Sequence, residues 1–387
     1  MNRLRYLTAG ESHGRALTGI LEGMPAGLEV DIDYINNELK RRQQGYGRGG
    51  RMKIESDEIE ILSGVRFGRT IGTPVSVKIG NRDWENWQKR MSVEKLPDDD
   101  LPEEVSIPRP GHADLAGAVK FGFSDIRNVI ERSSARETAI RTALGGFAGL
   151  FLRKFGIVIG SHVVEIHTVK SGHELNTDRL EAESKNADES PVRCLDKSAE
   201  KDMIKAIDTA KENGDTVGGV IEITAAGLPV GLGSYTHWDN KLDGKIASAM
   251  MSIPAIKAVE IGTGIEYGRK FGSELHDPII KGEKGNISRS SNNAGGIEAG
   301  ITNGQPVIVK ITMKPISTLI SALDSVDLST KEAVKARVER SDICAVPAAS
   351  VVAEAVLALV LADAFLGKFY GDNIDDIKKI YDGRRRL

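Results

Sequence analysis

The chain has 387 residues, and its 52 Lys and Arg against 55 Asp and Glu leave a formal net charge of −3. A balance this close to neutral argues against a globally basic protein that coats nucleic acid or an anionic membrane surface. With 40% hydrophobic and 28% charged residues, the composition is that of a folded globular protein and excludes a disordered one.

Helical periodicity and capping signals predict helices at residues 33–42, 112–121, 135–154, 241–252, 331–339 and 350–366. Alternating apolar residues predict strands at the ends of 64–79 and 296–311, and further strands at 157–168 and 217–224. Ser134 and Glu137 have the spacing of a capping box, which predicts a sharp start for the third helix. The last helix is apolar, but Glu354 and Asp363 fall on opposite faces, so we expect it in a protein core and not in a membrane.

Two collinear matches indicate an internal repeat. Residues 64–79 align without gaps on residues 296–311, with 9 of 16 positions identical. Residues 19–30 match residues 219–230 in the same order, with 6 of 12 positions identical. Two matches in the same order indicate the duplication of one β-rich unit.

The repeat predicts the architecture. We expect one domain over residues 1–387, in which 19–79 is related to 219–311. Strands from two related halves, with long apolar helices between the matching units, predict an α+β fold in which a helical layer is sandwiched between antiparallel sheets.

Two motifs place a histidine beside glycine, namely GESHG at residues 10–14 and RPGHAD at residues 109–114. Histidine titrates near neutral pH, and glycine lets the backbone approach a ligand. A structural turn explains the first motif equally well. The second motif is more indicative, because Arg109 accompanies His112.

Two other segments are rich in arginine. Residues 41–51 (RRQQGYGRGGR) contain four arginines among glycines, which suits a small molecule of high negative charge. An RGG-like nucleic-acid segment or a solvated loop is the alternative, although such segments are usually terminal and low in complexity. Residues 132–138 (RSSARET) place two arginines and two hydroxyls at a predicted helix N-terminus, where phosphate is attracted.

The remaining patterns set limits on the chemistry. No cluster of His, Cys and Asp has metal-ligand spacing, and no P-loop is present. Cys194 and Cys344 are too isolated for a disulfide framework, and the first residues lack the apolar core of a secretory signal, so we expect a cytoplasmic location. The residues alone thus predict an arginine-lined site for a multiply anionic substrate with two histidines as proton carriers, and they leave the reaction open.

Taken together, five segments resemble the signature blocks of the chorismate synthase family, in family order over nearly the whole chain. They are GESHG at 10–14, RPGHAD at 109–114, RSSARET at 132–138, SNNAGGI at 291–297 and RSDICAVPAASVVAEAV at 340–356. The resemblance implies conversion of 5-enolpyruvylshikimate 3-phosphate to chorismate with loss of phosphate, in aromatic amino-acid biosynthesis. It also implies a requirement for reduced FMN, without net redox change, and a homotetramer.

The resemblance further implies roles for single residues. His13 would protonate the departing phosphate, and His112 would hold a proton near the reduced flavin. Asp342, with Ser12 as a relay, would help to remove the proton from flavin N5. The side chains that bind the substrate would be Arg51, Arg109 and Arg136.

For FMN, the resemblance implies contacts from Arg132, Ser133, Ser134, Pro254, Ala255, Ala299, Lys314, Pro315, Ile316, Ser317, Thr318 and Arg340. The chain departs from the family pattern at two of these positions, because Pro254 replaces a frequent Gln or Asn and Ala299 a frequent Gly. Arg42 and Arg48 match positions assigned to NADPH, but their charge could equally serve the substrate or loop closure. No appended reductase domain is visible, so we expect an external flavin reductant.

Two functions of other classes stay open. An RNA-binding protein that uses the Arg/Gly loop would bind RNA in a salt-sensitive way, but the net charge of −3 and only 5% aromatic residues argue against it. A flavin oxidoreductase would consume NADPH at every turnover, whereas a lyase would need only catalytic reductant. We expect a small-molecule substrate, and neither a nucleic-acid nor a membrane partner.

Overall fold

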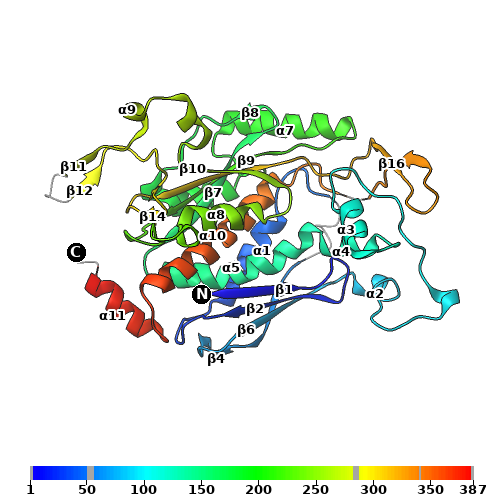
Figure 1. The fold of residues 1–387 in the computed structure, drawn as a ribbon, viewed down its shortest axis with the longest axis horizontal. Helices are drawn as coiled ribbons and strands as arrows, with labels where there is room; N and C mark the ends of the chain where they lie inside the picture. The colour runs from blue at the N-terminus through cyan, green and yellow to red at the C-terminus, as the bar shows by residue number, and fades with distance from the viewer. Residues whose placement is uncertain (1–2, 50–55, 282–286, 340, 385–387) are drawn as a thin grey trace.

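Two antiparallel sheets enclose a layer of helices in the computed structural model, which describes residues 3–49, 56–281, 287–339 and 341–384 (Figure 1). The first sheet has the strand order β1-β2-β6-β3, and the second has the order β10-β15-β9-β7-β8. The strands of the first sheet are β1 (Arg5–Ala9), β2 (Ala16–Glu22), β3 (Ile59–Ser63) and β6 (Val75–Gly80). Those of the second are β7 (Val158–Ile166), β8 (Val169–Lys170), β9 (Gly219–Ala226), β10 (Ile256–Ile261) and β15 (Val307–Met313). The predicted α+β sandwich is confirmed.

The layer between the sheets is built from α1 (Ile32–Gln43), α5 (Thr138–Arg153), α8 (Leu242–Met251) and α10 (Val346–Lys368). Helix α5 packs on β2 and β6 of the first sheet, whereas α10 packs on β7 and β9 of the second. The two helices also pack against each other, which joins the two halves of the molecule. Two more helices, α6 (Leu180–Asp188) and α7 (Lys197–Glu212), contact β7 and β8, and α7 lies on the side of the second sheet away from α10 (Figure 1).

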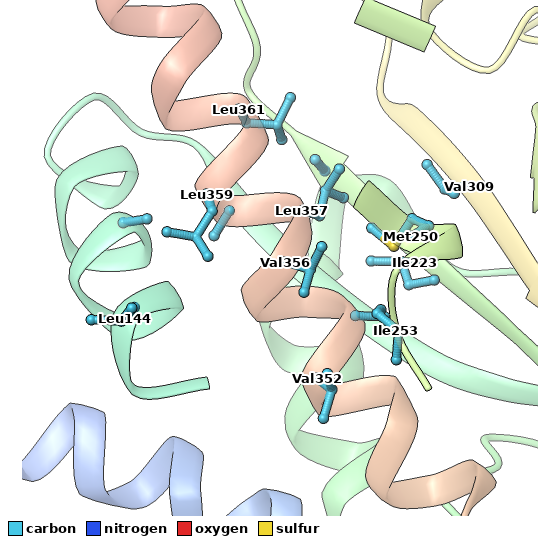
Figure 2. Close-up of a cluster of buried hydrophobic side chains, with 14 of the residues drawn as sticks. Leu144, Ile223, Met250, Ile253, Val309, Val352, Val356, Leu357, Leu359 and Leu361 are labelled. Carbon is cyan, nitrogen blue, oxygen red and sulfur yellow. The ribbon is translucent and has the colours of Figure 1, made fainter. Parts of the chain in front are cut away.

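Helix α10 is the central core element. Among the described residues it is the helix long and apolar enough to cross a membrane, and 83% of its most apolar window is buried inside the protein. Figure 2 shows Leu357 on the side of Ile223 and Met250, while Leu359 lies on the side of Leu144 of α5. The prediction of a buried core helix is therefore confirmed.

The two acidic groups of α10 are both satisfied inside the protein. The Glu354 carboxylate forms ion pairs with Arg41 at 2.8 Å and with Arg193 at 3.1 Å. The Asp363 Oδ1 atom accepts hydrogen bonds from the backbone N–H groups of Arg3 and Leu4. Buried charges are tolerated where such partners compensate them.

The strand registers repeat between the sheets. Leu17 pairs with Ile79 in the first sheet, and Ile221 pairs with Ile311 in the second. Ile79 matches Ile311 in the sequence repeat. Strand β2 therefore corresponds to β9, and Leu17 occupies the position in the first sheet that Ile221 occupies in the second. The match of 19–30 with 219–230 is therefore wrong by four residues, an even slip that preserves which side chains face the core.

A buried hydroxyl makes the same contacts in both halves. Thr70 Oγ1 donates to the Pro25 carbonyl at 2.6 Å and accepts from the Leu28 N–H. Thr302 Oγ1 makes the equivalent bonds to the Pro229 carbonyl, at 2.7 Å, and to the Leu232 N–H. These repeated contacts support our inference that the chain arose by internal duplication.

The smaller elements decorate this frame. Among the described residues, four two-stranded antiparallel sheets are formed by β4 (Val65–Arg66) with β5 (Arg69–Thr70), β11 (Ile279–Lys281) with β12 (Ile287–Arg289), β13 (Ile297–Glu298) with β14 (Ile301–Thr302), and β16 (Asp324–Val326) with β17 (Ala333–Lys335). The other helices are α2 (Trp84–Trp87), α3 (Asp114–Phe121), α4 (Arg127–Arg132), α9 (Gly272–Leu275) and α11 (Ile374–Arg384).

Two local predictions are wrong. Residues 331–339 were expected to be helical but contain β17, because Lys331 takes a left-handed conformation with φ of +64° and the segment folds back on β16. The capping box is only half formed: Ser134 Oγ accepts from the Arg136 N–H, but the Glu137 carboxylate binds Thr8 and Arg141 instead of turning back. Tertiary partners outweigh the local pattern at both places.

Candidate active site

The two histidine motifs lie at one end of the sandwich, near α3 and α4 (Figure 1). His13 occupies the turn between β1 and β2, and His112 directly precedes α3. Arg132, the last residue of α4, donates hydrogen bonds to the carbonyls of Thr8 and Gly10, each at 3.1 Å. The Arg132 guanidinium therefore fixes the turn that carries His13.

His13 is held by a buried carboxylate. Its Nδ1 lies 2.9 and 3.0 Å from the two Glu131 oxygens, and its backbone N–H donates to the same group at 2.7 Å. Although burial raises the pKa of the Glu131 carboxyl, the hydrogen bonds from His13 and the charge of Arg127 lower it overall. An ionised carboxylate can only accept, so Nδ1 carries a proton and Nε2 is assigned to exchange with a substrate. The Trp87 ring stacks on the imidazole with centroids 3.8 Å apart.

His112 is held in the same manner. Its Nδ1 lies 2.5 Å from Asp114 Oδ1, and the Asp114 side chain is fully buried. Arg109 donates from Nε to Asp114 Oδ2 at 2.8 Å, and its backbone N–H binds the same oxygen at 3.0 Å. Burial acts to raise the pKa of Asp114, but the hydrogen bonds from His112 and Arg109 bring it well below its usual range.

The segment 314–318 (KPIST) closes over the His112 loop. Lys314 Nζ and Ser317 Oγ both donate to the Gly111 carbonyl, at 2.6 and 2.8 Å. Thr318 Oγ1 accepts from Arg109 at 3.1 Å. Burial lowers the pKa of Lys314. The side chains of this segment that are predicted to contact flavin therefore lie next to the loop of His112, a predicted catalytic histidine. Pro315 and Ile316 are the residues between Lys314 and Ser317 in the sequence.

Arg42 and Arg136 share one acidic partner. Arg136 donates to Asp57 at 2.6 Å, and the Arg42 guanidinium lies 3.7 Å from the same carboxylate. Arg42 also donates to Thr138 Oγ1 and to the Ala135 carbonyl at the entry of α5. Both cations are buried, and the structure places them at the helix entry that the sequence predicted to attract anions.

Asp342 lies at the equivalent entry of α10. Its carboxylate pairs with Arg48 at 3.0 Å and accepts from the Gly49 N–H at 2.7 Å. Ser341 Oγ donates to the Thr318 carbonyl, which connects this entry to the KPIST segment. Within the described residues, Arg48 and Gly49 thus connect the glycine-rich loop to Asp342.

The other predicted residues occupy the positions that follow. Ser134 Oγ donates to Ser12 Oγ at 3.2 Å, whereas Ser133 Oγ donates to a carbonyl of its own helix. The Ala255 carbonyl accepts from the Lys314 N–H, so Pro254 and Ala255 lie beside the KPIST segment. Ala299 is at the β13–β14 turn with φ of +50°, where its neighbour Gly300 contacts α8. This left-handed conformation explains why glycine suits that position. Arg51 and Arg340 lie outside the described residues.

Several side chains at this site were not predicted. They are Asp57, Trp87, Asp114, Arg127, Glu131 and Glu339. Asp114 had a local signal, since it follows His112 by two residues. Glu131 is 118 positions from His13, and only the three-dimensional fold brings the two together.

The site combines paired imidazole and carboxylate groups with buried guanidinium groups. Such a set suits proton exchange on a multiply anionic molecule, and this chemistry places the chain among enzymes of acid–base catalysis. A family model described as chorismate synthase matches residues 4–366. The chain therefore belongs to the chorismate synthase family, the lyases that form chorismate in the shikimate pathway.

Individual relatives agree over nearly the full length. The chain is 56% identical over 377 residues to the chorismate synthase of Carboxydothermus hydrogenoformans, covering 97% of both chains. It is 53% identical over 384 residues to that of Geobacillus thermodenitrificans, covering 99% of both. A crystal structure of chorismate synthase superposes with a TM-score of 0.79 at 43% identity, covering 98% of this chain and 97% of the other.

The family uses reduced FMN, and the donor set of this chain suits such a molecule. A phosphate and a ribityl chain accept or exchange hydrogen bonds with ammonium and hydroxyl groups. Lys314, Ser317 and Thr318 supply these groups on one segment. Gly111 packs directly against them, since an added Cβ would be in van der Waals contact with Ser317 and Lys314, at 3.4 and 3.5 Å.

Proposed function

We propose that this chain carries out its reaction with His13 as the acid that protonates the departing phosphate of 5-enolpyruvylshikimate 3-phosphate. The observation that carries this proposal is the hydrogen bond of His13 Nδ1 to the buried Glu131 carboxylate, which orients the imidazole so that Nε2 can give a proton to phosphate. The products are phosphate and chorismate, and the substrate loses one C–O bond and one C–H bond. Positioned acids of this kind contribute about 10²–10⁴-fold to the rate.

His112 has the second protonic role in the proposal. The buried Asp114 carboxylate orients its ring beside the KPIST segment. The KPIST segment would hold reduced FMN, which would supply electron density for the elimination. Asp342, with Ser12 as a relay, would take up a proton at flavin N5; Ser12 contacts Ser134, and Asp342 is oriented by Arg48.

The arginines hold the anionic groups of the substrate. We assign this role to Arg51, Arg109 and Arg136, because a carboxylate or phosphate binds a guanidinium in a bidentate manner. Arg136 lies at the entry of α5, where the helix dipole adds to its charge. We also propose that FMN is contacted by residues 132–134, 254–255, 299, 314–318 and 340.

Reduction and assembly complete the proposal. An external reductant supplies the electrons that reduce FMN. NADPH is the candidate for this reductant, and Arg42 and Arg48 would bind it. The exposed side chains of Leu7 and Ile20 are directly paired across β1 and β2, and this apolar outer face supports a homotetramer. The location would be cytoplasmic, consistent with two unpaired cysteines.

The test is an anaerobic assay with photoreduced FMN and 5-enolpyruvylshikimate 3-phosphate. We expect phosphate and chorismate to form in equal amounts while the reductant is needed only catalytically. No phosphate release would contradict the elimination. NADPH consumption in step with turnover would instead favour an oxidoreductase.

His13→Ala and His112→Ala should each lower turnover at least tenfold while FMN still binds, because each removes a proton carrier. His237→Ala is the matched control, since His237 is exposed and pairs with Asp239. Turnover is measured as phosphate release, and FMN binding by fluorescence. Near-normal turnover in either site variant would remove the role assigned to that histidine.

A further inference from the structure

The two halves of the chain carry similar tetrapeptides, which differ only at the fourth residue, ahead of their central helices. Residues 131–134 read ERSS, and residues 339–342 read ERSD. Each glutamate stands seven residues before the first residue of a central helix, α5 at Thr138 and α10 at Val346. The two helices pack against each other, and Glu131 and Glu339 both lie beside Arg127 at one end of the sandwich. Glu131 and Glu339 are therefore equivalent positions of the duplicated fold.

Glu131 holds the first histidine directly. Its side chain is fully buried, both of its oxygens bind His13 Nδ1, and the Arg127 guanidinium lies 3.4 Å from Oε1. Arg127 and Arg90 also stand over the face of Trp87, whose ring stacks on His13. The charged groups that face Glu131 are thus His13 and Arg127.

Glu339 joins this group to the second histidine. Its carboxylate lies 3.6 Å from Arg127 and 3.7 Å from Arg109, and Arg337 Nε donates to it at 2.9 Å. Arg109 in turn binds Asp114, which holds His112. Basic and acidic side chains alternate along this path, which runs through His13, Glu131, Arg127, Glu339, Arg109, Asp114 and His112.

We propose that Glu339 is a positioning residue that holds Arg127 and Arg109 beside each other and thereby couples the two histidine–carboxylate pairs into one electrostatic unit. This inference rests on the proposed function only for the catalytic roles of the histidines. Without the Glu339 charge, two largely buried guanidinium groups face each other with no carboxylate between them. Their repulsion disfavours a further positive charge on either imidazole, so the pKa of both His13 and His112 falls.

The experiment compares Glu339→Gln with Glu332→Gln in the full-length protein. Glu332 is exposed on the β16–β17 hairpin, so its substitution removes the same charge from the same stretch of chain outside the path. The readouts are the imidazole pKa values of His13 and His112 by NMR and the pH dependence of kcat. In Glu339→Gln we expect both pKa values to fall by at least 0.5 pH unit. The alkaline limb of kcat then moves to lower pH by the same amount, and Glu332→Gln matches the wild type.

Two more variants separate positioning from folding. Glu339→Asp keeps the charge and should restore at least half of the shift. Glu131→Gln should move the His13 signal by at least 0.5 pH unit and the His112 signal by less than half of that. Turnover lost in Glu339→Gln with both imidazole pKa values unmoved would overturn the proposal, as would a failure of Glu339→Asp to restore them. The NMR readout needs no turnover, so a wild-type protein without phosphate release would sink the proposed function and leave this inference standing.

Discussion

Each candidate histidine is oriented by a buried carboxylate at Nδ1. Glu131 and Asp114 are buried and ionised, and each binds an imidazole whose own side chain is 16–20% exposed. Burial on one side and access on the other give the imidazole a fixed orientation and an open path to a ligand. Carboxylate partners that fix the ring and the tautomer are common for functional histidines.

Trp87 adds a third contact to His13, and Trp87→Ala should lower turnover about 2–12-fold. An aromatic stack contributes about 0.5–1.5 kcal/mol, and about 1.4 kcal/mol corresponds to a factor of ten in rate. Trp84→Ala in the same short helix is the control, because the ring contact of His13 is with Trp87. The measurement is kcat at saturating substrate. A Trp87→Ala enzyme as fast as Trp84→Ala would show that the stack has no catalytic consequence.

Sequence patterns located both histidines but not their partners. His13 and His112 stand in short motifs with glycine, and these motifs are visible without a structure. Glu131 and Trp87 reach His13 through the pairing of β1 with β2 and the packing of α4, which no local spacing encodes. Asp114 was within reach of the sequence, since it lies in the same motif as His112.

At the scale of elements, the contact of α5 with α10 determines how the two halves meet. A Cβ added at Gly145 of α5 would lie 2.4 Å from the Cβ atom of Ala355 and 2.6 Å from its backbone. Two backbones approach this closely only where one residue lacks a side chain. The entries of both helices carry site residues, Ser134 before α5 and Asp342 before α10.

Gly145→Ala should therefore destabilise the protein by about 1–3 kcal/mol, the usual cost of overpacking. Gly244→Ala in α8 is the matched control, because an added Cβ there meets nothing within 4 Å. Alanine is the better helix former, so this control should gain up to about 1 kcal/mol. The free energy of unfolding in urea measures both. Equal stabilities of the two variants would contradict the close packing of α5 and α10.

Secondary-structure predictions succeeded where apolar residues recur over several turns of a helix or along a strand. Helices α1, α8 and α10 and strands β7 and β9 were all expected from periodicity. Residues 331–339 failed because KEAVKARVE has a helical composition, while its partner strand β16 and the Lys331 turn are set by tertiary packing. Helices α6, α7 and α11 were not expected.

For the whole molecule, the internal duplication that we infer would explain why one end carries the site. Each half supplies a sheet, a central helix and a glutamate ahead of that helix, and Glu131 and Glu339 meet at Arg127. The similarity was visible in the sequence, but its register was not, because residues 19–30 share 6 of 12 positions with 219–230 and only 4 of 12 with 223–234, the register of the structure. Hydrogen bonds of Thr70 and Thr302 fix the register.

The acid sensitivity of the fold follows from the same buried carboxylates. The folded-state pKa of Asp114 is below its ordinary value of 3.8. A group of this kind stabilises the fold above its ordinary pKa and loses that stabilisation as the pH falls toward its folded pKa. Asp114→Asn should therefore cost about 3–5 kcal/mol at pH 7, because it removes one partner of a buried ion pair. The difference from wild type should shrink steadily below about pH 4.

Asp99→Asn, in an exposed loop, is the control and should change stability by less than about 0.5 kcal/mol at any pH. Thermal and urea unfolding between pH 7 and pH 3 measure the difference. The pH dependence that Glu38 contributes to stability has the opposite sign. Burial raises the pKa of Glu38, so its ionisation weakens the fold as the pH rises. A gap between wild type and Asp114→Asn that is the same at pH 3 as at pH 7 would mean that the Asp114 charge does not stabilise the fold, and that its effect is one of shape alone.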